Sequence, residues 1–325
     1  MIINKSKVNR ILVITLSNVG DVILTTPVIK TLKAEFPTAR IDVMVGPRGK
    51  DIFEKDPHVF ELIIYDKRIS IAAKYRLQIK LKKTKYNLVV DLKNTIFPIV
   101  ICPKYRTAII QRFPKSVVHA IDRHLYRLKS MGIEKILREP YLHIPKEDEE
   151  YVSSLLAESN INRPIVLVSP GAKSHLKRWT AEGFAKVSDK LARECRVAIV
   201  FIGTGEDKIL VDDVIKNMKT KPYDFVDRTN IRQLASLMKR AKLLITNDSA
   251  PLHLGCAVGT KVLAVFGPTD PKRYGPIGEF DVVVRREHLF CSPCEIAVCK
   301  YNYECMKLIT AHKVFDAARM MIKTG

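Results

Sequence analysis

The 325-residue sequence lacks any apolar run of the roughly 18 residues that a membrane-spanning helix requires. The apolar run from Ile11 to Leu16 is too short, and is too soon followed by Asp21, to form the core of a secretion signal. We therefore expect a soluble cytosolic protein. Seven cysteines in a chain without a secretion signal favour reduced thiols or metal ligands over a disulfide framework.

Glycine-rich phosphate-binding motifs are also missing. The turn Ser17–Asp21 holds one glycine, and Gly203-Thr204-Gly205 is followed by Lys208 where a dinucleotide-binding motif has its third glycine. The chain has no P-loop either. These absences argue against a dehydrogenase and against a P-loop nucleotidase.

Acidic residues are scarce in one part of the chain. The whole sequence has 55 basic and 34 acidic residues, a formal charge of +21. The segment from Lys67 to Lys129 contains 16 Lys or Arg but only Asp91 and Asp122, which gives 16 − 2 = +14. We expect an anionic partner that meets the N-terminal half.

The order of apolar segments predicts two α/β domains with parallel, doubly wound sheets. The length of the chain also favours two domains. The charged segment Lys146–Arg163, with one short helix, marks the junction, so we predict domains at residues 1–155 and 156–325. The expected strands are Arg10–Leu16, Ile41–Val45, Leu62–Tyr65, Leu88–Leu92, Ile165–Ser169, Val197–Ile202, Leu243–Thr246 and Lys261–Phe266.

The run Lys242–Asp270 predicts a compact strand, helix and strand. Asn247-Asp248-Ser249 favours a turn and a helix start, with Pro251 in the first helical turn. Such a helix start after a parallel strand suits a phosphate or diphosphate. Ser249 and His253 lie four residues apart and can face the same ligand. The alternative is that Asp248 and Ser249 only cap the helix.

Three other positions could carry chemistry. Asp21 follows the first strand, where it could act as a general base; the alternative is an N-cap or first-turn acid. Lys177, in the basic loop before the single tryptophan, Trp179, could bind phosphates, or the loop could simply be solvated. Glu206 could accept hydrogen bonds from ribose hydroxyls or be a helix-start acid.

The last candidate is a cysteine cluster spaced C-x2-C-x4-C-x5-C, formed by Cys291, Cys294, Cys299 and Cys305. Four thiolates at these intervals could hold zinc or an iron–sulfur cluster. No histidine or second CxxC completes a familiar finger, so reduced, partly buried thiols are the favoured interpretation and we expect no metal.

Three motifs, in order along the chain, resemble those of glycosyltransferase family 9, the ADP-heptose:lipopolysaccharide heptosyltransferases. They are SNVGDVILTTPVIKTLK, SPGAKSHLKRWTAEGFAKV and ITNDSAPLHLGCAVGTKVLAVFGPTDPKRYGP. The resemblance runs the length of the chain. It implies the GT-B fold, in which two Rossmann-like domains face each other across a cleft, with the acceptor on the N-terminal side and the nucleotide sugar on the C-terminal side.

The resemblance also implies roles for single residues. Asp21 matches the catalytic aspartate, Lys177 the lysine that contacts the diphosphate, and Glu206 the glutamate near the ribose. The matches to the donor-binding turn and helix are Asp248, Ser249, Ala250 and His253. Two positions depart from the family pattern. Ala250 stands where glycine is usual, which requires helical backbone there, and Thr229-Asn230 replaces a common Thr-Gly.

The predicted function is an inverting, metal-independent transfer of heptose from ADP-L-glycero-D-manno-heptose to an anionic lipid-linked saccharide of the lipopolysaccharide inner core. No cofactor is expected. The protein is expected in the cytoplasm, in peripheral contact with the inner face of the inner membrane. The alternatives are another nucleotide sugar, a non-catalytic nucleic-acid-binding protein, which the lack of an RNA-binding motif disfavours, and a single-domain epimerase.

Overall fold

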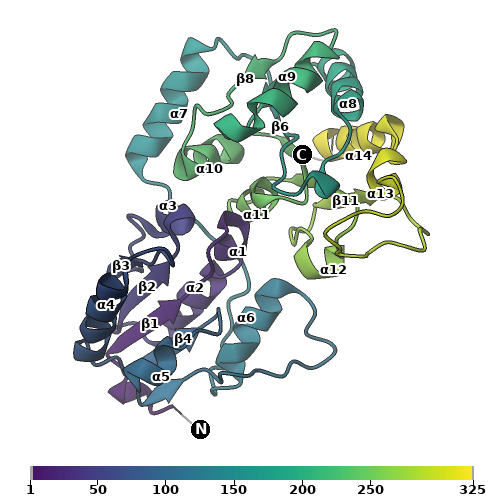
Figure 1. Cartoon of the computed structure of the whole chain (residues 1–325). Coiled ribbons are helices and arrows are strands. Elements are labelled where there is room, and N and C mark those ends of the chain that lie inside the picture. The colour runs from purple at the N-terminus through teal and green to yellow at the C-terminus, as the bar shows by residue number, and fades with distance from the viewer. Residues whose placement is uncertain (1–2, 324–325) are drawn as a thin grey trace. The chain divides into compact units, whose positions relative to one another are not determined.

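The computed structural model describes residues 3–323 and divides the chain into two compact units, residues 1–143 (unit 1) and 144–325 (unit 2) (Figure 1). Each unit is a parallel sheet with helices, which confirms the expected α/β class. The expected domain boundary after residue 155 lies inside α7 (Lys146–Glu158). This helix is part of unit 2, where it packs against α10 (Ile231–Lys239).

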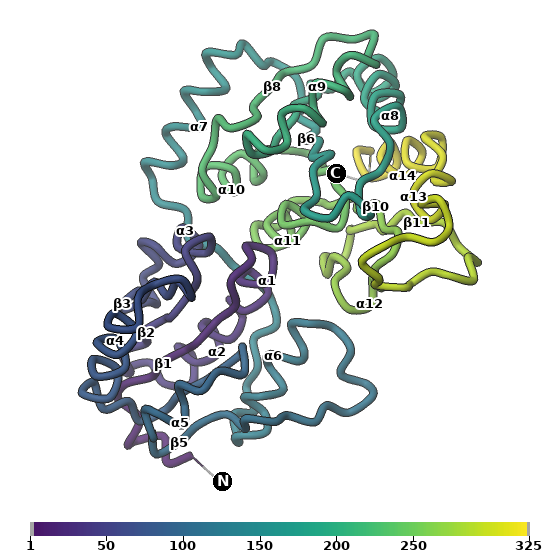
Figure 2. The backbone as a smooth tube through the Cα atoms, in the orientation of Figure 1, coloured from purple at the N-terminus to yellow at the C-terminus, as the bar shows by residue number. Residues whose placement is uncertain are grey.

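Unit 1 contains a five-stranded sheet in the order β3-β2-β1-β4-β5. Its strands are β1 (Arg10–Ile14), β2 (Arg40–Val45), β3 (Glu61–Ile64), β4 (Leu88–Asp91) and β5 (Tyr105–Arg106). Its helices are α1 (Val19–Ile23), α2 (Thr26–Glu35), α3 (Lys50–Phe53), α4 (Ile71–Lys83), α5 (Phe97–Ile101) and α6 (Ala120–Lys129). The backbone trace in Figure 2 follows this alternation of strands and helices.

Unit 2 contains a six-stranded sheet in the order β11-β10-β9-β6-β7-β8. Its strands are β6 (Ile165–Ser169), β7 (Ala198–Phe201), β8 (Tyr223–Asp224), β9 (Leu243–Asn247), β10 (Val262–Phe266) and β11 (Val282–Arg285). Besides α7 and α10, its helices are α8 (Ala181–Glu194), α9 (Lys208–Lys216), α11 (Ala250–Ala257), α12 (Pro271–Tyr274), α13 (Glu304–Lys307) and α14 (Ala311–Lys323).

The central strands form because their sequences are almost continuously apolar. All residues of β6, β9 and β10 are buried, as parallel strands covered by helices on both faces require. The eight strands expected from the sequence are confirmed. Three short strands, β5, β8 and β11, were not expected, and each lies at the edge of a sheet.

The order of strands reverses once in each unit. In unit 1 the chain leaves β1 on one side and returns to its other side at β4; in unit 2 the same happens between β6 and β9. Where strand order reverses, the loops at the carboxyl ends of neighbouring strands diverge and leave room for a ligand. Each unit therefore has one position that its topology marks for binding.

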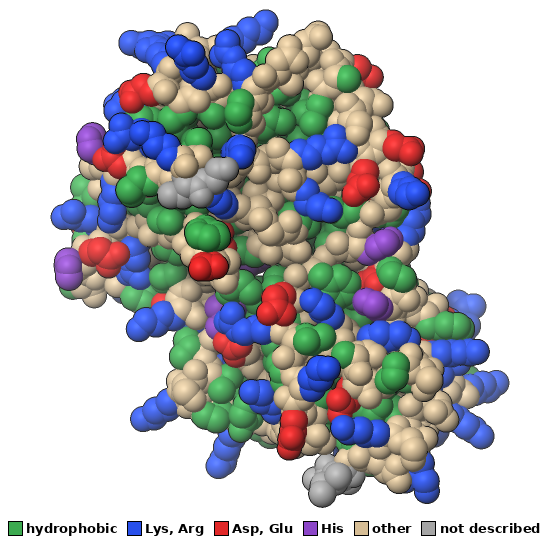
Figure 3. All heavy atoms as spheres, turned by 180° about the vertical axis from the view of Figure 1, so that it is seen from behind, with side chains coloured by type: hydrophobic (Ala, Val, Ile, Leu, Met, Phe, Trp, Pro, Cys, Tyr) green, Lys and Arg blue, Asp and Glu red, His purple; other side chains and the backbone are tan. Residues whose placement is uncertain are grey.

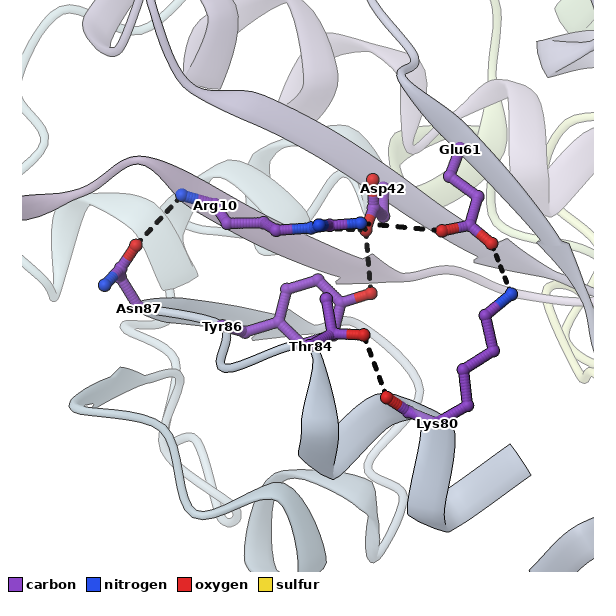
Figure 4. A network of polar contacts seen from close by, with 7 residues as sticks. All are labelled: Arg10, Asp42, Glu61, Lys80, Thr84, Tyr86 and Asn87. Atoms are coloured by element: carbon purple, nitrogen blue, oxygen red, sulfur yellow. Dashed lines mark hydrogen bonds and ion pairs between the residues drawn. The ribbon is translucent and has the colours of Figure 1, made fainter. Parts of the chain in front are cut away.

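A polar network crosses the sheet of unit 1 near the beginnings of its strands (Figure 4). Asp42 in β2 is fully buried, and its Oδ2 accepts hydrogen bonds from Arg10 Nε at 3.1 Å, Arg10 Nη2 at 3.0 Å and the Tyr86 hydroxyl at 2.8 Å. Burial, together with the hydrogen bond to Asp42, raises the pKa of Tyr86. Glu61 lies 3.6 Å from Arg10 and also pairs with Lys80. These contacts compensate the burial of the Asp42 charge.

Within residues 3–323, no helix is both long enough and apolar enough to cross a membrane.

We predict that Tyr86→Phe lowers the free energy of unfolding by about 1–2 kcal/mol, because the buried Asp42 loses a hydrogen-bond donor. The measurement is urea unfolding of the full chain. Tyr75→Phe is the matched control, since Tyr75 is 63% exposed and should change stability by less than about 0.5 kcal/mol. Equal effects of the two substitutions would show that the hydroxyl of Tyr86 does not stabilise the sheet.

Candidate functional site

The loop after β6 is fixed to the end of β9 by one fully buried side chain. Asn247 donates from Nδ2 to the carbonyl of Pro170 at 2.8 Å and accepts at Oδ1 from the backbone N–H of Trp179 at 3.0 Å. The Trp179 indole donates to the carbonyl of Ile309 at 3.0 Å. Both ends of the loop 170–179 are thus held at the strand-order reversal of unit 2.

Lys177 and Asp248 meet at this position. Lys177 ends a short 3-10 helix, His175–Lys177, and its Nζ lies 2.6 Å from Asp248 Oδ2. Thr269, after β10, donates its hydroxyl to the same oxygen at 2.5 Å. Asp248 is buried, whereas the side chain of Lys177 keeps 30% of its surface exposed. One carboxylate therefore joins the loops after β6, β9 and β10, and Lys177 still reaches solvent.

The structure supports the capping alternative for Asp248 and Ser249 only in part. Ser249 occupies the N-cap position of α11, but among the described residues neither side chain makes a capping hydrogen bond to this helix. The Ser249 hydroxyl lies instead 3.2 Å from that of Thr246. Ala250 begins the helix with helical backbone, as its substitution for glycine requires, and Pro251 lies in the first turn.

The expectation that His253 faces the same ligand as Ser249 stays a prediction, and His253 is largely buried. It is 7% exposed, one turn into α11. The half-buried residues at the helix start are Ser249, Ala250 and Pro251, so these are the ones with surface left for a ligand.

Glu206 follows β7 in a 3-10 helix, Gly205–Asp207, and is exposed. The neighbouring Asp207 caps this helix, because its Oδ2 accepts from the backbone N–H of Thr204 at 2.9 Å and from its hydroxyl at 3.0 Å. Asp207 also fills the space beside Gly171, where an added Cβ would lie 2.2 Å from its Oδ1. A side chain at position 171 would therefore displace Asp207, so glycine lets the loops after β6 and β7 approach each other.

Asp21 lies at the strand-order reversal of unit 1. It is half-buried in the first turn of α1 and accepts a hydrogen bond from Asn18 Nδ2 at 2.9 Å. Asn18 occupies the N-cap position, so of the two alternatives to a general base Asp21 is the first-turn acid and not the N-cap. A first-turn carboxylate is also favoured by the helix dipole.

A cavity of about 430 Å³ opens at the carboxyl ends of the strands in the same unit. Its lining, all of it within the described part of the chain, includes Lys67, Lys74 and Lys93 and no acidic side chain. Burial and the nearby charge of Lys67 lower the pKa of Lys93. The other lining residues are mostly apolar and include Ile14, Met44, Tyr65, Ile96 and Phe97. The chemistry of the cavity suits an anionic group on a larger ligand.

The loop after β4 is held in place beside this cavity. The Asp91 carboxylate accepts from the backbone N–H of Lys93 at 2.8 Å and from the Thr95 hydroxyl at 2.9 Å. Arg127 of α6 is buried and donates from Nη2 to Asn94 Oδ1 at 3.1 Å, while its Nη1 has no partner among the described residues. The sequence shows the excess of cations in this segment, but the cavity forms only when the chain folds.

The four cysteines near the C-terminus line one cavity of about 20 Å³. Burial, and repulsion from the other three sulfurs, raise the pKa of Cys305 to about 11. Cys299 Sγ accepts from the backbone N–H groups of Tyr301 and Tyr303, both at 3.3 Å. Within residues 3–323, no three His, Cys, Asp or Glu side chains are placed to hold a metal ion.

A family model described as glycosyltransferase family 9 (heptosyltransferase) matches residues 100–304. The chain is 28% identical over 276 residues to lipopolysaccharide heptosyltransferase 3 of Escherichia coli K12, a match that covers 77% of this chain and 80% of that relative.

Solved structures resemble the chain from end to end. A glycosyl transferase family 9 structure from Veillonella parvula DSM 2008 has a TM-score of 0.86 and 25% identity, and the match covers 98% of each chain. ADP-heptose lps heptosyltransferase II of E. coli has a TM-score of 0.79 and 21% identity, with 97% of this chain and 99% of that chain covered. The likeness confirms the expected GT-B fold.

We predict that iodoacetamide modifies Cys305 far more slowly at pH 7 than the exposed Cys102. The thiolate is the reactive form, and a thiol with a pKa of about 11 is almost fully protonated at neutral pH. The rate at Cys305 should rise about tenfold per pH unit until the pH approaches its pKa. Peptide mass spectrometry gives the rate at each site.

A chelator serves as the control for this measurement. We expect that it changes neither the labelling rate at Cys305 nor the melting temperature, and that the purified protein carries well below one equivalent of zinc or iron. Stoichiometric metal, or rapid labelling of Cys305 at pH 7, would contradict the reduced-thiol interpretation.

Proposed function

Because the chain belongs to glycosyltransferase family 9, we propose that it transfers a heptose from ADP-L-glycero-D-manno-heptose to an anionic saccharide of the lipopolysaccharide inner core. The chain is a glycosyltransferase, and its curated relatives are lipopolysaccharide heptosyltransferases. The location proposed for the donor site is supported by the cluster of Lys177, Asp248 and Thr269 at the strand-order reversal of unit 2.

The donor diphosphate is proposed to bind between Lys177 and the start of α11. An ammonium group has three hydrogen-bond donors, so Lys177 can keep its contact with Asp248 and still donate to phosphate oxygens. The backbone N–H of Ala250 and the Ser249 hydroxyl lie at the helix start, where the dipole favours negative charge. The exposed Glu206 would accept hydrogen bonds from the ribose.

Asp21 is proposed as the general base. Its carboxylate takes the proton of the acceptor hydroxyl while that oxygen attacks the anomeric carbon of the heptose, and the bond from this carbon to the diphosphate breaks. Attack on the face opposite the leaving ADP inverts the anomeric configuration. Lys177 and the start of α11 would stabilise the charge that develops on ADP, which needs no metal ion.

The acceptor is proposed to place an anionic group in the cavity lined by Lys67, Lys74 and Lys93. Charge supports this assignment, since the cavity is lined by cations without acids. The acceptor of such a transfer is linked to a lipid, so we propose that the protein works in the cytoplasm in peripheral contact with the inner face of the inner membrane.

The first test concerns Asp21. Asp21→Asn should lower turnover at least about a hundredfold, because general bases contribute roughly 10²–10⁴-fold and asparagine cannot accept the proton. Donor affinity should not change. Asp51→Asn, the same change in the first turn of α3, is the matched control and should leave turnover intact. Turnover above about a tenth of wild type would remove Asp21 from the mechanism.

The second test concerns the donor. Lys177→Met should weaken binding of ADP-heptose and of ADP alone at least about tenfold, because both lose a charge-assisted bond to the diphosphate. Lys186→Met, at an exposed position on α8, should have no effect. Isothermal titration gives both affinities, and thermal melting confirms that the variant is folded.

The same titration should include UDP- and GDP-sugars, which we expect to bind more weakly than ADP-heptose. An affinity of Lys177→Met within twofold of wild type would place the diphosphate elsewhere.

Replacement of basic residues between Lys80 and Arg127 by Gln should weaken binding of the acceptor but not of the donor, because charges further apart than about 10 Å are screened at 0.1 M salt.

A further inference from the structure

Helix α4 of unit 1 has an exposed apolar stripe. Ile71, Tyr75 and Ile79 are 85%, 63% and 37% exposed, respectively. They lie four residues apart, so their side chains follow one another along the same side of the helix. The opposite side of α4 already packs on the protein through Leu77 and the fully buried Leu81. The helix is therefore apolar on two sides, and the protein covers only one of them.

The charge around this stripe has a single sign. The sequence contains eight Lys or Arg and no Asp or Glu between Lys67 and Val90. Lys80 of α4 pairs with Glu61, and Lys74 lines the cavity of unit 1. The others on the helix, Arg76, Lys82 and Lys83, are exposed and have no ion-pair partner within residues 3–323. Figure 3, which views the molecule from behind, shows Lys and Arg side chains projecting from the side of unit 1 that carries α4.

Neighbouring elements extend the apolar surface. Helix α5 packs against α4, and Ile96 and Ile99 at this helix are 63% and 54% exposed. Ile96 also lines the cavity, as do Lys74 and Gln78 of α4. The same two helices therefore border the cavity and present exposed isoleucines beside it.

We propose that α4 docks unit 1 on the anionic surface of a phospholipid bilayer, with Ile71, Tyr75 and Ile79 inserted at the level of the head groups. An interfacial helix combines an apolar face with Lys and Arg that contact anionic lipids, and α4 has both features. Tyrosine is favoured at this depth because its ring is apolar and its hydroxyl reaches water. The inference rests on the proposed function, because a lipid-linked acceptor lies in such a surface.

Two other occupants fit the observations less well. A second copy of the chain that used the same face on both sides would bring the unpaired cations Arg76, Lys82 and Lys83 against each other. A nucleic acid would be attracted by the cations, but the exposed Ile71 and Ile79 make no favourable contact with its phosphates. A bilayer uses both the cations and the apolar side chains.

Docking by α4 would also serve the transfer. The cavity proposed to hold an anionic group of the acceptor is lined in part by Lys74 and Gln78 of the same helix, so docking by α4 would bring the cavity close to the head groups. A lipid-linked saccharide could then enter the cavity while its acyl chains stay in the bilayer.

The test is flotation of the full chain with vesicles of phosphatidylcholine alone or mixed with phosphatidylglycerol. We expect the wild type to float with the anionic vesicles only. The triple variant I71S/Y75S/I79S should bind them at least about tenfold more weakly, because three apolar anchors are lost. The matched control is I209S/F280S/L308S, which makes similar changes at exposed positions of unit 2 and should bind like the wild type.

A second variant tests the charges. R76Q/K82Q/K83Q should lose the preference for anionic vesicles and show a flatter dependence on salt. Binding of I71S/Y75S/I79S equal to wild type would overturn the proposal. So would tighter binding to a DNA duplex than to anionic vesicles, or a concentration-dependent dimer that this variant abolishes.

Activity separates this inference from the proposed function. With a deacylated, water-soluble acceptor, I71S/Y75S/I79S should transfer heptose like the wild type; with the lipid-linked acceptor in anionic vesicles, its rate should fall at least about tenfold. Equal loss with both acceptors would show that the stripe does not act through the membrane. If the wild type transferred heptose to neither acceptor, that result would instead contradict the proposed function.

Discussion

The ion pair of Lys177 and Asp248 is the contact on which the arrangement of the proposed donor site depends. It joins residues that follow different strands, and Thr269 contributes a third loop to the same carboxylate oxygen. Asp248 is buried, so its charge needs partners, and removal of Lys177 would leave that charge without the one cation that pairs with it among residues 3–323. The pair thus holds an ammonium group at the end of the sheet before any ligand arrives, which lowers the cost of ordering it on binding.

Parallel sheets explain why both proposed sites lie where they do. At the beginnings of the strands in unit 1, the Asp42 network fixes the sheet with charges compensated in the interior. At the carboxyl ends, loops diverge and carry side chains such as Asp21 and Lys177. The buried Asn247 shows how such a loop is kept in place, because it binds both ends of residues 170–179. The strands therefore form a rigid support, and the loops that follow them hold the polar and charged side chains.

Apolar runs in the sequence predicted the central strands, because a strand buried on both faces needs such a run. The two-residue strand β5 has no such signal, since an edge strand is defined by its neighbour. The local sequence could place Asp248 only at a helix start that either binds a phosphate or is capped; it could not show the ion pair, because Lys177 lies 71 residues away. The cation excess was visible, but only the fold shows that Lys74 lines a cavity while Arg76 faces solvent. Family membership also removes the alternative of a non-catalytic nucleic-acid-binding protein, which charge alone had left open.

The central claim is that the chain moves a heptose from ADP-heptose to an inner-core saccharide with inversion. The most direct measurement combines the purified chain, ADP-heptose and a deacylated inner-core acceptor, followed by mass spectrometry and NMR of the product. The account predicts one added heptose for each ADP released, joined with the anomeric configuration opposite to that of the donor. An acceptor that remains unchanged, or a product that retains the configuration of the donor, would contradict it.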